Sequence, residues 1–296
     1  MNEFIITVPA SSANIGPGFD SAGIAIQRYL TLNVSKSNNW HFDHRSACLP
    51  EDSHFADHYI YQIANRVADQ FGKTLPASHV IVHSDIPLAR GLGSSSSAVI
   101  AGIELANQRC GLNLSKHDKL KLATEIEGHP DNVAPALLGG LIITTTARQV
   151  EYVRLSELGI DLVLSIPTIE LKTEDARQVL PNTLSRADAT HASSVCNVMI
   201  AALLTEDYKL AGQMMEADAF HEPYRAMLIP NYEVIKQEAK TLGAYGTVIS
   251  GAGPTLISFV PKGKGKTIAQ KIQDKLPDYD ITSLEMDVTG LQVYEA

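Results

Sequence analysis

The chain has 296 residues, a length that corresponds to roughly two domains of average size or to one large domain. Hydrophobic residues make up 45% of it and charged residues 19%, a composition that excludes intrinsic disorder and predicts a folded globular protein. The formal net charge is −9 and no long run of like charges occurs, so we expect neither a nucleic acid nor an anionic membrane surface as a partner.

The cysteines and the amino-terminal residues point to the compartment. Three cysteines lie far apart, and no pair has the spacing of a thiolate metal site or of a disulfide framework. The first residues lack the basic and apolar regions of a signal peptide, so we expect a cytoplasmic protein. The longest uncharged stretch, residues 241–261, contains glycines and prolines and is predicted to form strand, turn and strand, not a membrane helix.

In chain order, the first predicted elements are two strands and a helix. Residues typical of strands occur at 4–8 and 24–34, and a loop of small residues, Gly and Pro separates them. Apolar residues at helical spacing predict a helix over 59–71, and a strand follows at 79–83. A loop rich in glycine and serine then opens another helix, which is predicted to end at Gly111.

A further helix is predicted over residues 113–127, with Ser115 as its cap, and a strand over 141–146. We place a domain boundary near residue 150, which divides the chain into units 1–150 and 151–296. The second unit is predicted to contain a strand at 162–166, helices at 191–204, 208–218 and 232–242, two strands around 251–254, a helix near 268 and a last strand. This alternation indicates an α+β fold in which helices cover sheets.

The segment PLARGLGSSSSA at residues 87–98 is predicted to bind phosphate. The first turn of a helix leaves N–H groups unpaired, glycines let an anion approach the backbone, and serine hydroxyls add donors. The alternative is a serine-capped helix after a turn. The segment is neither a Walker A loop, because no Lys follows the second glycine, nor a dinucleotide-binding fingerprint, because the third glycine is missing.

Two other segments place polar residues on loops. Residues 11–20 present Asn14 and Asp20 among glycines and a proline, which indicates either a binding loop or a tight turn capped by Asp20. Residues 125–132 offer three carboxylates and an amide, enough to hold a Mg²⁺ ion that bridges phosphates, or they form a solvated helix end. His129 has no second His or Cys at ligand spacing, so zinc is not expected there.

Four segments together resemble the ordered motifs of the GHMP small-molecule kinases. They are PASSANIGPGFD at 9–20, PLARGLGSSSS at 87–97, EGHPDNVAP at 127–135 and SGAGPT at 250–255, joined by TEDAR at 173–177 and by Arg225. The resemblance implies a two-domain α+β fold, with a ribosomal-S5-like βαβ unit in the N-terminal domain and a ferredoxin-like C-terminal domain. The active site would lie between them.

The resemblance is greatest to the family members that act on L-homoserine. It implies ATP- and Mg²⁺-dependent phosphorylation of the homoserine side-chain hydroxyl, which gives O-phospho-L-homoserine on the route to threonine. Glu125 and Ser94 are the implied metal ligands, and Glu127 is a rival because the stretch before Asp131 is shorter than in some relatives. The implied ATP-binding residues are Pro87, Leu88, Ala89, Arg90, Gly91, Leu92, Gly93, Ser94, Ser95, Ser96 and Ser97.

The resemblance also assigns the acceptor site. Asp20 suits the ammonium group of an amino acid, and arginines suit its carboxylate. Asp131 and Ser94 are the implied catalytic residues, although a loose phosphoryl-transfer transition state also permits Asp131 to act by positioning alone. The residues expected around the substrate are Asn14, Asp20, Asn132, Arg177 and Arg225.

Two alternatives stay open from the sequence. A GHMP kinase for mevalonate or a sugar would share the phosphate loop, but neither of these substrates carries an ammonium group for Asp20. A non-catalytic sensor of the same fold would keep the loop, yet Glu125, Asp131 and Ser94 are all present in this chain. The resemblance further implies a homodimer.

Overall fold

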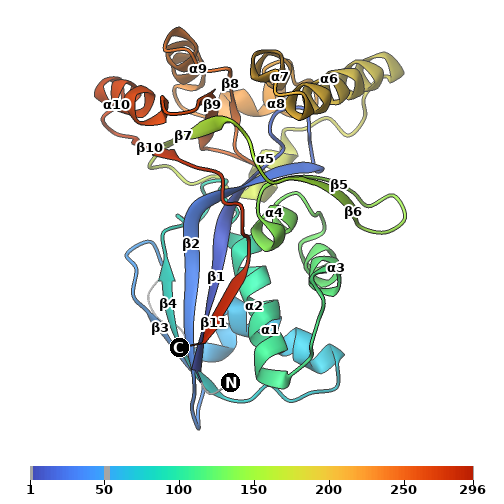
Figure 1. The fold of residues 1–296 in the computed structure, drawn as a ribbon, viewed down its shortest axis with the longest axis vertical. Helices are drawn as coiled ribbons and strands as arrows, with labels where there is room; N and C mark the ends of the chain where they lie inside the picture. Colours follow the sequence, from blue (N-terminus) through green and yellow to red (C-terminus); the bar gives the residue numbers. More distant parts are fainter. Residues whose placement is uncertain (1–2, 50–53, 296) are drawn as a thin grey trace.

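The computed structural model describes residues 3–49 and 54–295. Two parts are stacked along the long axis of the molecule, each built on its own sheet, as Figure 1 shows. Within these residues no helix has the length and apolar character needed to cross a bilayer.

The first sheet occupies the lower part in Figure 1 and has the strand order β11-β1-β2-β4-β3, with β5 and β6 attached beside β2. Its neighbours run antiparallel except for β3 and β4, which are parallel. The strands are β1 (Glu3–Ala13), β2 (Ala22–Lys36), β3 (His41–His44), β4 (Ser78–Ser84), β5 (Leu141–Thr145), β6 (Glu151–Leu155) and β11 (Gln292–Glu295).

The first strand is longer than the sequence predicted. Residues 10–13 continue to pair with β2 after a shift of register between Pro9 and Ala10, because small residues satisfy the ladder through their backbone. The expected loop therefore begins at Asn14 instead of Pro9.

Helices cover one face of the first sheet (Figure 1). They are α1 (Tyr59–Gln70), α2 (Ser94–Cys110), α3 (Lys116–Glu127) and α4 (Val133–Leu138), and a 3-10 turn, η1 (Phe55–Asp57), precedes them. Most of α2 is buried because its apolar residues occur all round the helix. Gly102 of α2 makes room for α1, since a Cβ there would lie 2.7 Å from Cβ of Ile63. The predicted cap of α3 is confirmed, because Ser115 and Asp118 form a capping box.

The second sheet forms the upper part and has the strand order β10-β7-β9-β8. Its strands are β7 (Ile160–Ile166), β8 (Gly246–Ile249), β9 (Leu256–Pro261) and β10 (Asp280–Leu284). The strands β8 and β9 confirm the predicted strand-turn-strand segment. The helices of this part are α5 (Thr173–Gln178), α6 (Arg186–Leu204), α7 (Tyr208–Met215), α8 (Glu222–Arg225), the 3-10 turn η2 (Ala226–Leu228), α9 (Tyr232–Thr241) and α10 (Gly265–Lys275).

Alternate residues of β7 enter different apolar clusters. Val163 belongs to the cluster that contains residues of α9 and α10, whereas Leu162 and Leu164 belong to the larger cluster with Met199 of α6 and Met215 of α7. Since successive side chains of a strand point to opposite faces, helices cover both faces of this sheet.

The two sheets do not divide at residue 150. The strand β6, residues 151–155, pairs with β5, and β11, residues 292–295, pairs with β1, so both complete the first sheet. The pairing of β11 with β1 joins segments that are far apart in the sequence and leaves no local sequence pattern. The predicted boundary therefore placed β11 with the second unit. The helix α6 begins at Arg186, five residues before the predicted start, because Ser185 caps it.

Candidate active site

A cavity of about 680 Å³ lies between the two parts of the molecule. The first part contributes the phosphate loop, the loop after β1 and the segment that follows α3. The second part contributes α5, Arg225 of α8 and the turn at residues 251–252. The four segments that carry the family resemblance therefore meet at one place.

The phosphate loop ends at the amino terminus of α2. Gly93 is its N-cap residue with a φ of 67°, and Ser94 begins the helix. The residues of the loop that line the cavity are Ala89, Arg90, Gly91, Leu92, Gly93, Ser94, Ser95 and Ser96. A helix amino terminus with serine hydroxyls beside it is suited to an anion.

Three predicted loop residues lie outside this cavity. Ser97 is buried, and its hydroxyl group contacts the carbonyl oxygens of Pro9 and Gly93, which makes it part of the packing below the loop. Pro87 and Leu88 line other cavities. These three residues therefore do not line the cavity beside the phosphate loop, although Leu88 lines the second cavity described below.

Arg90 lines the cavity, but its guanidinium is occupied elsewhere. It donates to the carbonyl oxygens of Leu88, Pro167 and Thr168 at 3.1, 3.1 and 2.6 Å, and Glu170 lies 3.4 Å away. The Arg90 side chain thus links the phosphate loop to the segment that precedes α5, while the predicted contact of this residue with ATP stays a prediction.

The acidic residue beside the serines is Glu127. Its carboxylate accepts hydrogen bonds from Ser96 at 3.0 Å and from Ser95 at 3.5 Å. Glu125 is exposed and lines a separate cavity with His117 and other residues. Two residues apart on a helix are about 200° apart around its axis, so only one of the two glutamates can face the loop. Of the two glutamates that the sequence offered as metal ligands, Glu127 is therefore the one that lies beside the serines.

His129 and Asp131 form a close pair in the cavity wall. His129 Nδ1 lies 2.6 Å from Asp131 Oδ1, and Asp131 is almost fully buried. The hydrogen bond to Asp131 raises the pKa of His129 above its ordinary value, against the effect of burial. From the sequence, His129 was weighed only as a zinc ligand. Its place two residues before Asp131 was the available signal for this pairing.

Asp20 and Arg177 were predicted to bind opposite ends of a substrate, and here they contact each other. Arg177 Nη2 lies 2.8 Å from Asp20 Oδ1, and both side chains are more than one third exposed. The ligand atoms of Asp20, His129 and Asp131 lie within 4.8 Å of one another, but the Arg177 cation already neutralises Asp20. The pairing with Arg177 therefore makes this group a poor site for a metal ion.

Phe19 supports the arginines, a role that no sequence pattern indicated. The guanidinium carbons of Arg177 and Arg225 lie 5.7 and 5.4 Å from the centre of its ring. Both distances fall in the range of a cation–π contact. Phe19 thereby holds two cations that enter the site from α5 and α8.

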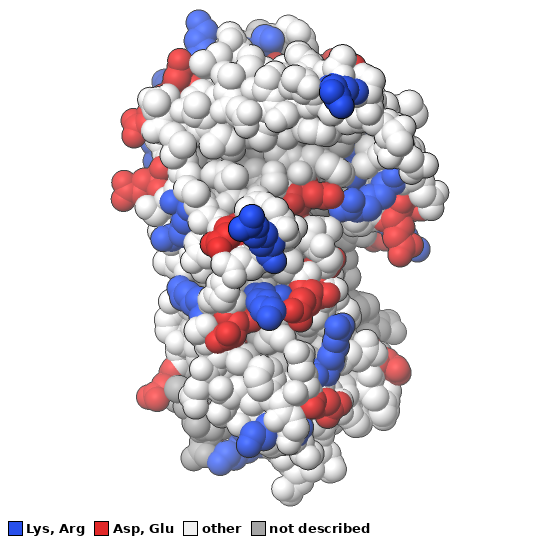
Figure 2. Space-filling model, turned by 90° about the vertical axis from the view of Figure 1, so that its right-hand side faces the viewer, with Lys and Arg blue, Asp and Glu red and all other residues white. Residues whose placement is uncertain are grey.

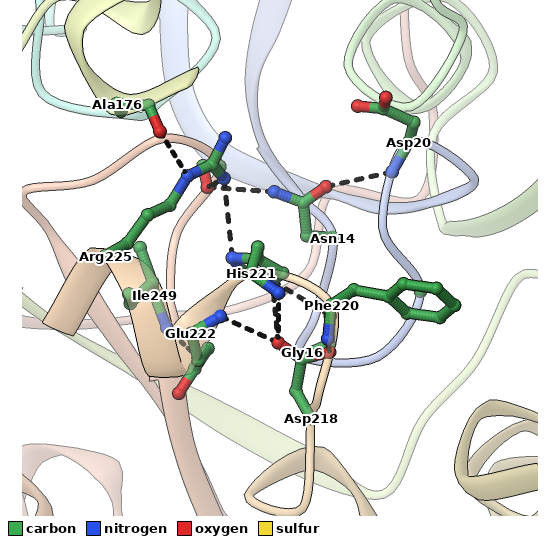
Figure 3. Close-up of polar contacts among 12 residues, drawn as sticks. Asn14, Gly16, Asp20, Ala176, Asp218, Phe220, His221, Glu222, Arg225 and Ile249 are labelled. Carbon is green, nitrogen blue, oxygen red and sulfur yellow. Dashed lines mark hydrogen bonds and ion pairs between the residues drawn. The ribbon is translucent and has the colours of Figure 1, made fainter. Parts of the chain in front are cut away.

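The two predicted asparagines reach the cavity with part of their amide groups already engaged. Asn14 donates to the carbonyl of Gly251 at 2.8 Å and accepts from the backbone N–H of Asp20 at 3.1 Å (Figure 3). Asn132 accepts a hydrogen bond from Ser11 at 2.9 Å. Both residues fix the shape of the site.

Arg225 is buried without a carboxylate partner among the residues that the structure describes. Its Nε donates to the carbonyl of Ala176 at 3.0 Å, and its Nη1 faces the carbonyl of Gly251 at 3.2 Å and His221 Nδ1 at 3.3 Å (Figure 3). Burial, and then the nearby Arg177, lower the pKa of Arg225 to about 10. An anion in the cavity would balance this charge.

A second cavity of about 490 Å³ adjoins the first. Tyr59, Ser94 and Ser95 line both cavities, so the two meet at the start of α2. The second cavity is mainly apolar, and its remaining lining residues are Leu30, His44, Leu49, Asp57, His58, Ile60, Val82, Ser84, Ile86, Leu88 and Ala98. Such a wall suits a flat, weakly polar group.

On the outer surface that Figure 2 displays, acidic and basic side chains are interspersed, without a continuous basic area.

Two family models match the chain. The one described as the GHMP kinases N terminal domain matches residues 58–140, and the one described as GHMP kinases C terminal matches residues 199–278. The first range includes the phosphate loop, Glu127 and Asp131, and the second includes Arg225.

Relatives match the chain along its whole length. It is 48% identical to a homoserine kinase from Oceanobacillus iheyensis, and the match covers 100% of both chains. Among solved structures, a candidate homoserine kinase from Listeria monocytogenes has a TM-score of 0.86 at 41% identity, with 99% and 100% of the two chains covered. A homoserine kinase from Cytophaga hutchinsonii has a TM-score of 0.86 at 26% identity, with 99% and 98% covered.

Proposed function

Because this chain belongs to the GHMP kinases, we infer that it uses ATP to phosphorylate the side-chain hydroxyl of L-homoserine. Curated relatives of this activity match the whole chain, one of them at 48% identity. The product is O-phospho-L-homoserine, on the route to threonine. The assignment of the site is supported mainly by one observation, that the phosphate loop, Glu127 and two arginines line the same cavity.

We propose that ATP occupies both cavities. The apolar cavity would accept the base, and the phosphates would pass Tyr59, Ser94 and Ser95, where the two cavities meet. They would then lie along Gly91 and Gly93, at the positive end of α2. Ser94, at this junction, would donate its hydroxyl to the phosphate that is transferred.

The carboxylate of Glu127 and the nearby serine hydroxyls offer oxygen ligands, the kind that Mg²⁺ prefers. Glu127 and Ser94 would hold the ion, and Ser95 and Ser96 keep the Glu127 carboxylate in place. When bound, Mg²⁺ neutralises charge that develops on the phosphates during transfer.

The other end of the cavity matches an amino acid. Arg225 offers an unbalanced positive charge to a carboxylate, and Arg177 lies beside it over the ring of Phe19. Asp20 offers a carboxylate to the ammonium group. Arg177, which is paired with Asp20 in the structure, would leave this pairing and turn toward the substrate. These charges support homoserine over mevalonate or a sugar, neither of which carries an ammonium group.

We propose that Asp131 orients the substrate hydroxyl and receives its proton late in the transfer. The hydrogen bond from His129 holds the Asp131 side chain in one orientation. A loose phosphoryl-transfer transition state needs little help from a base, so orientation would contribute most of the effect. Asn132 and Asn14 would keep the surrounding loops in position.

A cytoplasmic location is proposed from the cysteine spacing and the first residues of the sequence, and a homodimer from the family resemblance. Cell fractionation tests the first. Light scattering on the purified protein, which gives the molar mass in solution, tests the second.

The activity is tested by coupled ADP release with homoserine, mevalonate and galactose in parallel. Homoserine should be the preferred acceptor, and a preference for either of the others would contradict the assignment. The metal site is tested by comparing Glu127→Gln with its matched control, Glu125→Gln, across a Mg²⁺ titration. We expect Glu127→Gln to raise the Mg²⁺ requirement and lower kcat at least tenfold, while Glu125→Gln stays close to the unmodified protein.

A further inference from the structure

His221 lies directly behind the proposed substrate site and is completely buried. It precedes α8 and is four residues before Arg225. Its ring stacks on Phe19, with a distance of 5.4 Å between the ring centres. Figure 3 shows it between the Arg225 guanidinium and the loop at Gly16. None of the motifs in the sequence singled it out.

The two ring nitrogens of His221 face groups of opposite kind. Nε2 lies 3.0 Å from the carbonyl oxygen of Gly16 and 3.6 Å from a carboxylate oxygen of Asp218, both of which are acceptors. Nδ1 lies 3.3 Å from Nη1 of Arg225, which is a donor. The only arrangement that satisfies both sides is the neutral ring with its hydrogen on Nε2.

The surroundings keep the ring neutral. Burial lowers the pKa of His221 well below its ordinary value, and the guanidinium of Arg225 acts in the same direction. Asp218 acts in the opposite direction, but its carboxylate accepts the backbone N–H groups of residues 220, 221 and 222. A second hydrogen, on Nδ1, would point at the Arg225 cation.

The loop that His221 contacts carries Asp20. It leaves the first sheet after β1 and docks on the second part of the molecule, where the backbone N–H of Gly251 also donates to the carbonyl of Ala13 at 3.1 Å. Gly16 packs so closely there that a Cβ would lie 2.3 Å from the carbonyl oxygen of Met215. His221 thus connects the arginine of one part to the aspartate loop of the other.

We propose that His221 is a positioning residue for the acceptor substrate, which fixes the Arg225 guanidinium through Nδ1 and ties it through Nε2 to the loop that bears Asp20. This inference rests on the proposed role of Arg225 as the partner of the homoserine carboxylate. His221 itself touches no reacting atom. Its effect should therefore appear in the binding of homoserine and not in the binding of ATP.

Two substitutions separate the two contacts. His221→Gln places an N–H close to the position of Nε2 but removes the acceptor for Arg225, whereas His221→Asn keeps an acceptor at the position of Nδ1 and loses the contact with Gly16. A hydrogen bond to a charged group that is as long as 3.3 Å belongs at the weak end of its class. We therefore expect the KM for homoserine to rise roughly tenfold in His221→Gln, with the KM for ATP within about twofold of its original value. In His221→Asn, the KM for homoserine should stay much closer to that of the unmodified protein than in His221→Gln.

A substrate that lacks the carboxylate provides the control. With 3-aminopropan-1-ol as acceptor, His221→Gln and the unmodified protein should have similar kcat/KM values, because Arg225 has no carboxylate to bind. Equal losses in His221→Gln and His221→Asn, or an equal change in the KM for ATP, would overturn the proposal, since both indicate a general structural role.

Arg225→Met separates a failure of the proposed role of Arg225 from a failure of the proposed role of His221. If it leaves the KM for homoserine unchanged, the proposed function of Arg225 fails. If it raises that KM while His221→Gln does not, only the role of His221 fails. Should His221→Gln not fold, NMR of the unmodified protein with ¹⁵N-labelled histidine gives the answer: the hydrogen must reside on Nε2 at neutral pH, and the opposite tautomer refutes the proposal.

Discussion

Replacing Arg225 by Met should change activity far more than stability. The two opposing contributions can be worked out from its contacts. Lowering the pKa from its ordinary value of 12.5 to about 10 corresponds to roughly 3 kcal/mol against the charged form in the folded protein, at about 1.4 kcal/mol per unit. Met carries no charge, so this cost disappears with the substitution.

The substitution also removes the hydrogen bonds that Arg225 donates, which lowers the stability of the folded protein. The carbonyl of Ala176 and Nδ1 of His221 would each be left without their arginine donor, at about 1–3 kcal/mol apiece, whereas the carbonyl of Gly251 keeps its bond from Asn14. Because the two contributions oppose each other, we expect the free energy of unfolding to fall by less than about 3 kcal/mol.

Urea denaturation followed by circular dichroism measures this difference, and Arg177→Met is the matched control. Arg177 is partly exposed and paired with Asp20, so its removal should cost at most about 1 kcal/mol. In Arg225→Met, kcat/KM for homoserine should fall roughly 10- to 100-fold, and a given concentration of homoserine should raise the thermal midpoint less than in the unmodified protein. A loss of about 5 kcal/mol or more in the unfolding free energy would refute the reasoning, because it would make Arg225 a structural support.

His129→Gln should reduce the free energy of unfolding in a pH-dependent way. Because the pKa of His129 is raised in the folded state, its pairing with Asp131 stabilises the protein below about pH 6.5, and this stabilisation is lost as the pH rises through the folded-state pKa. Urea denaturation at pH 6 and pH 9 should therefore show a loss only at pH 6, and equal losses at both would contradict this account. Gly93→Ala should weaken ATP binding and stability, because a Cβ there lies 2.2 Å from the Ser11 hydroxyl at a positive φ. Gly128→Ala, also at a positive φ but with open space around it, is the control in calorimetric ATP titration; equal effects of the two would exclude the contact as the cause.

The parts of the site that depend on local chemistry could be predicted from the sequence. The glycines and serines of the phosphate loop define a helix amino terminus whose first N–H groups have no partner within the helix, and the structure brings Ser94, Ser95 and Ser96 to the cavity. The cap at Ser115 is equally local. These predictions needed only the residues on either side.

The remaining parts depend on contacts between distant segments. The choice between Glu125 and Glu127 required knowing which side of α3 faces the serines. The roles of Phe19 and His221 come from the docking of the loop after β1 against residues about 200 positions later. The periodicity of a sequence gives the buried side of each element, but it does not say which partner covers that side.

The pairing of β11 with β1 affects how the protein is made. Phe4 faces Glu295 across the ladder, and β1 and β11 lie side by side in the first sheet (Figure 1). During translation, this edge of β1 stays without its partner strand until residues 292–295 have left the ribosome, long after β1 itself. A nascent chain with an open strand edge is prone to association with other chains, so β11 closes an edge that has been open since β1 was made.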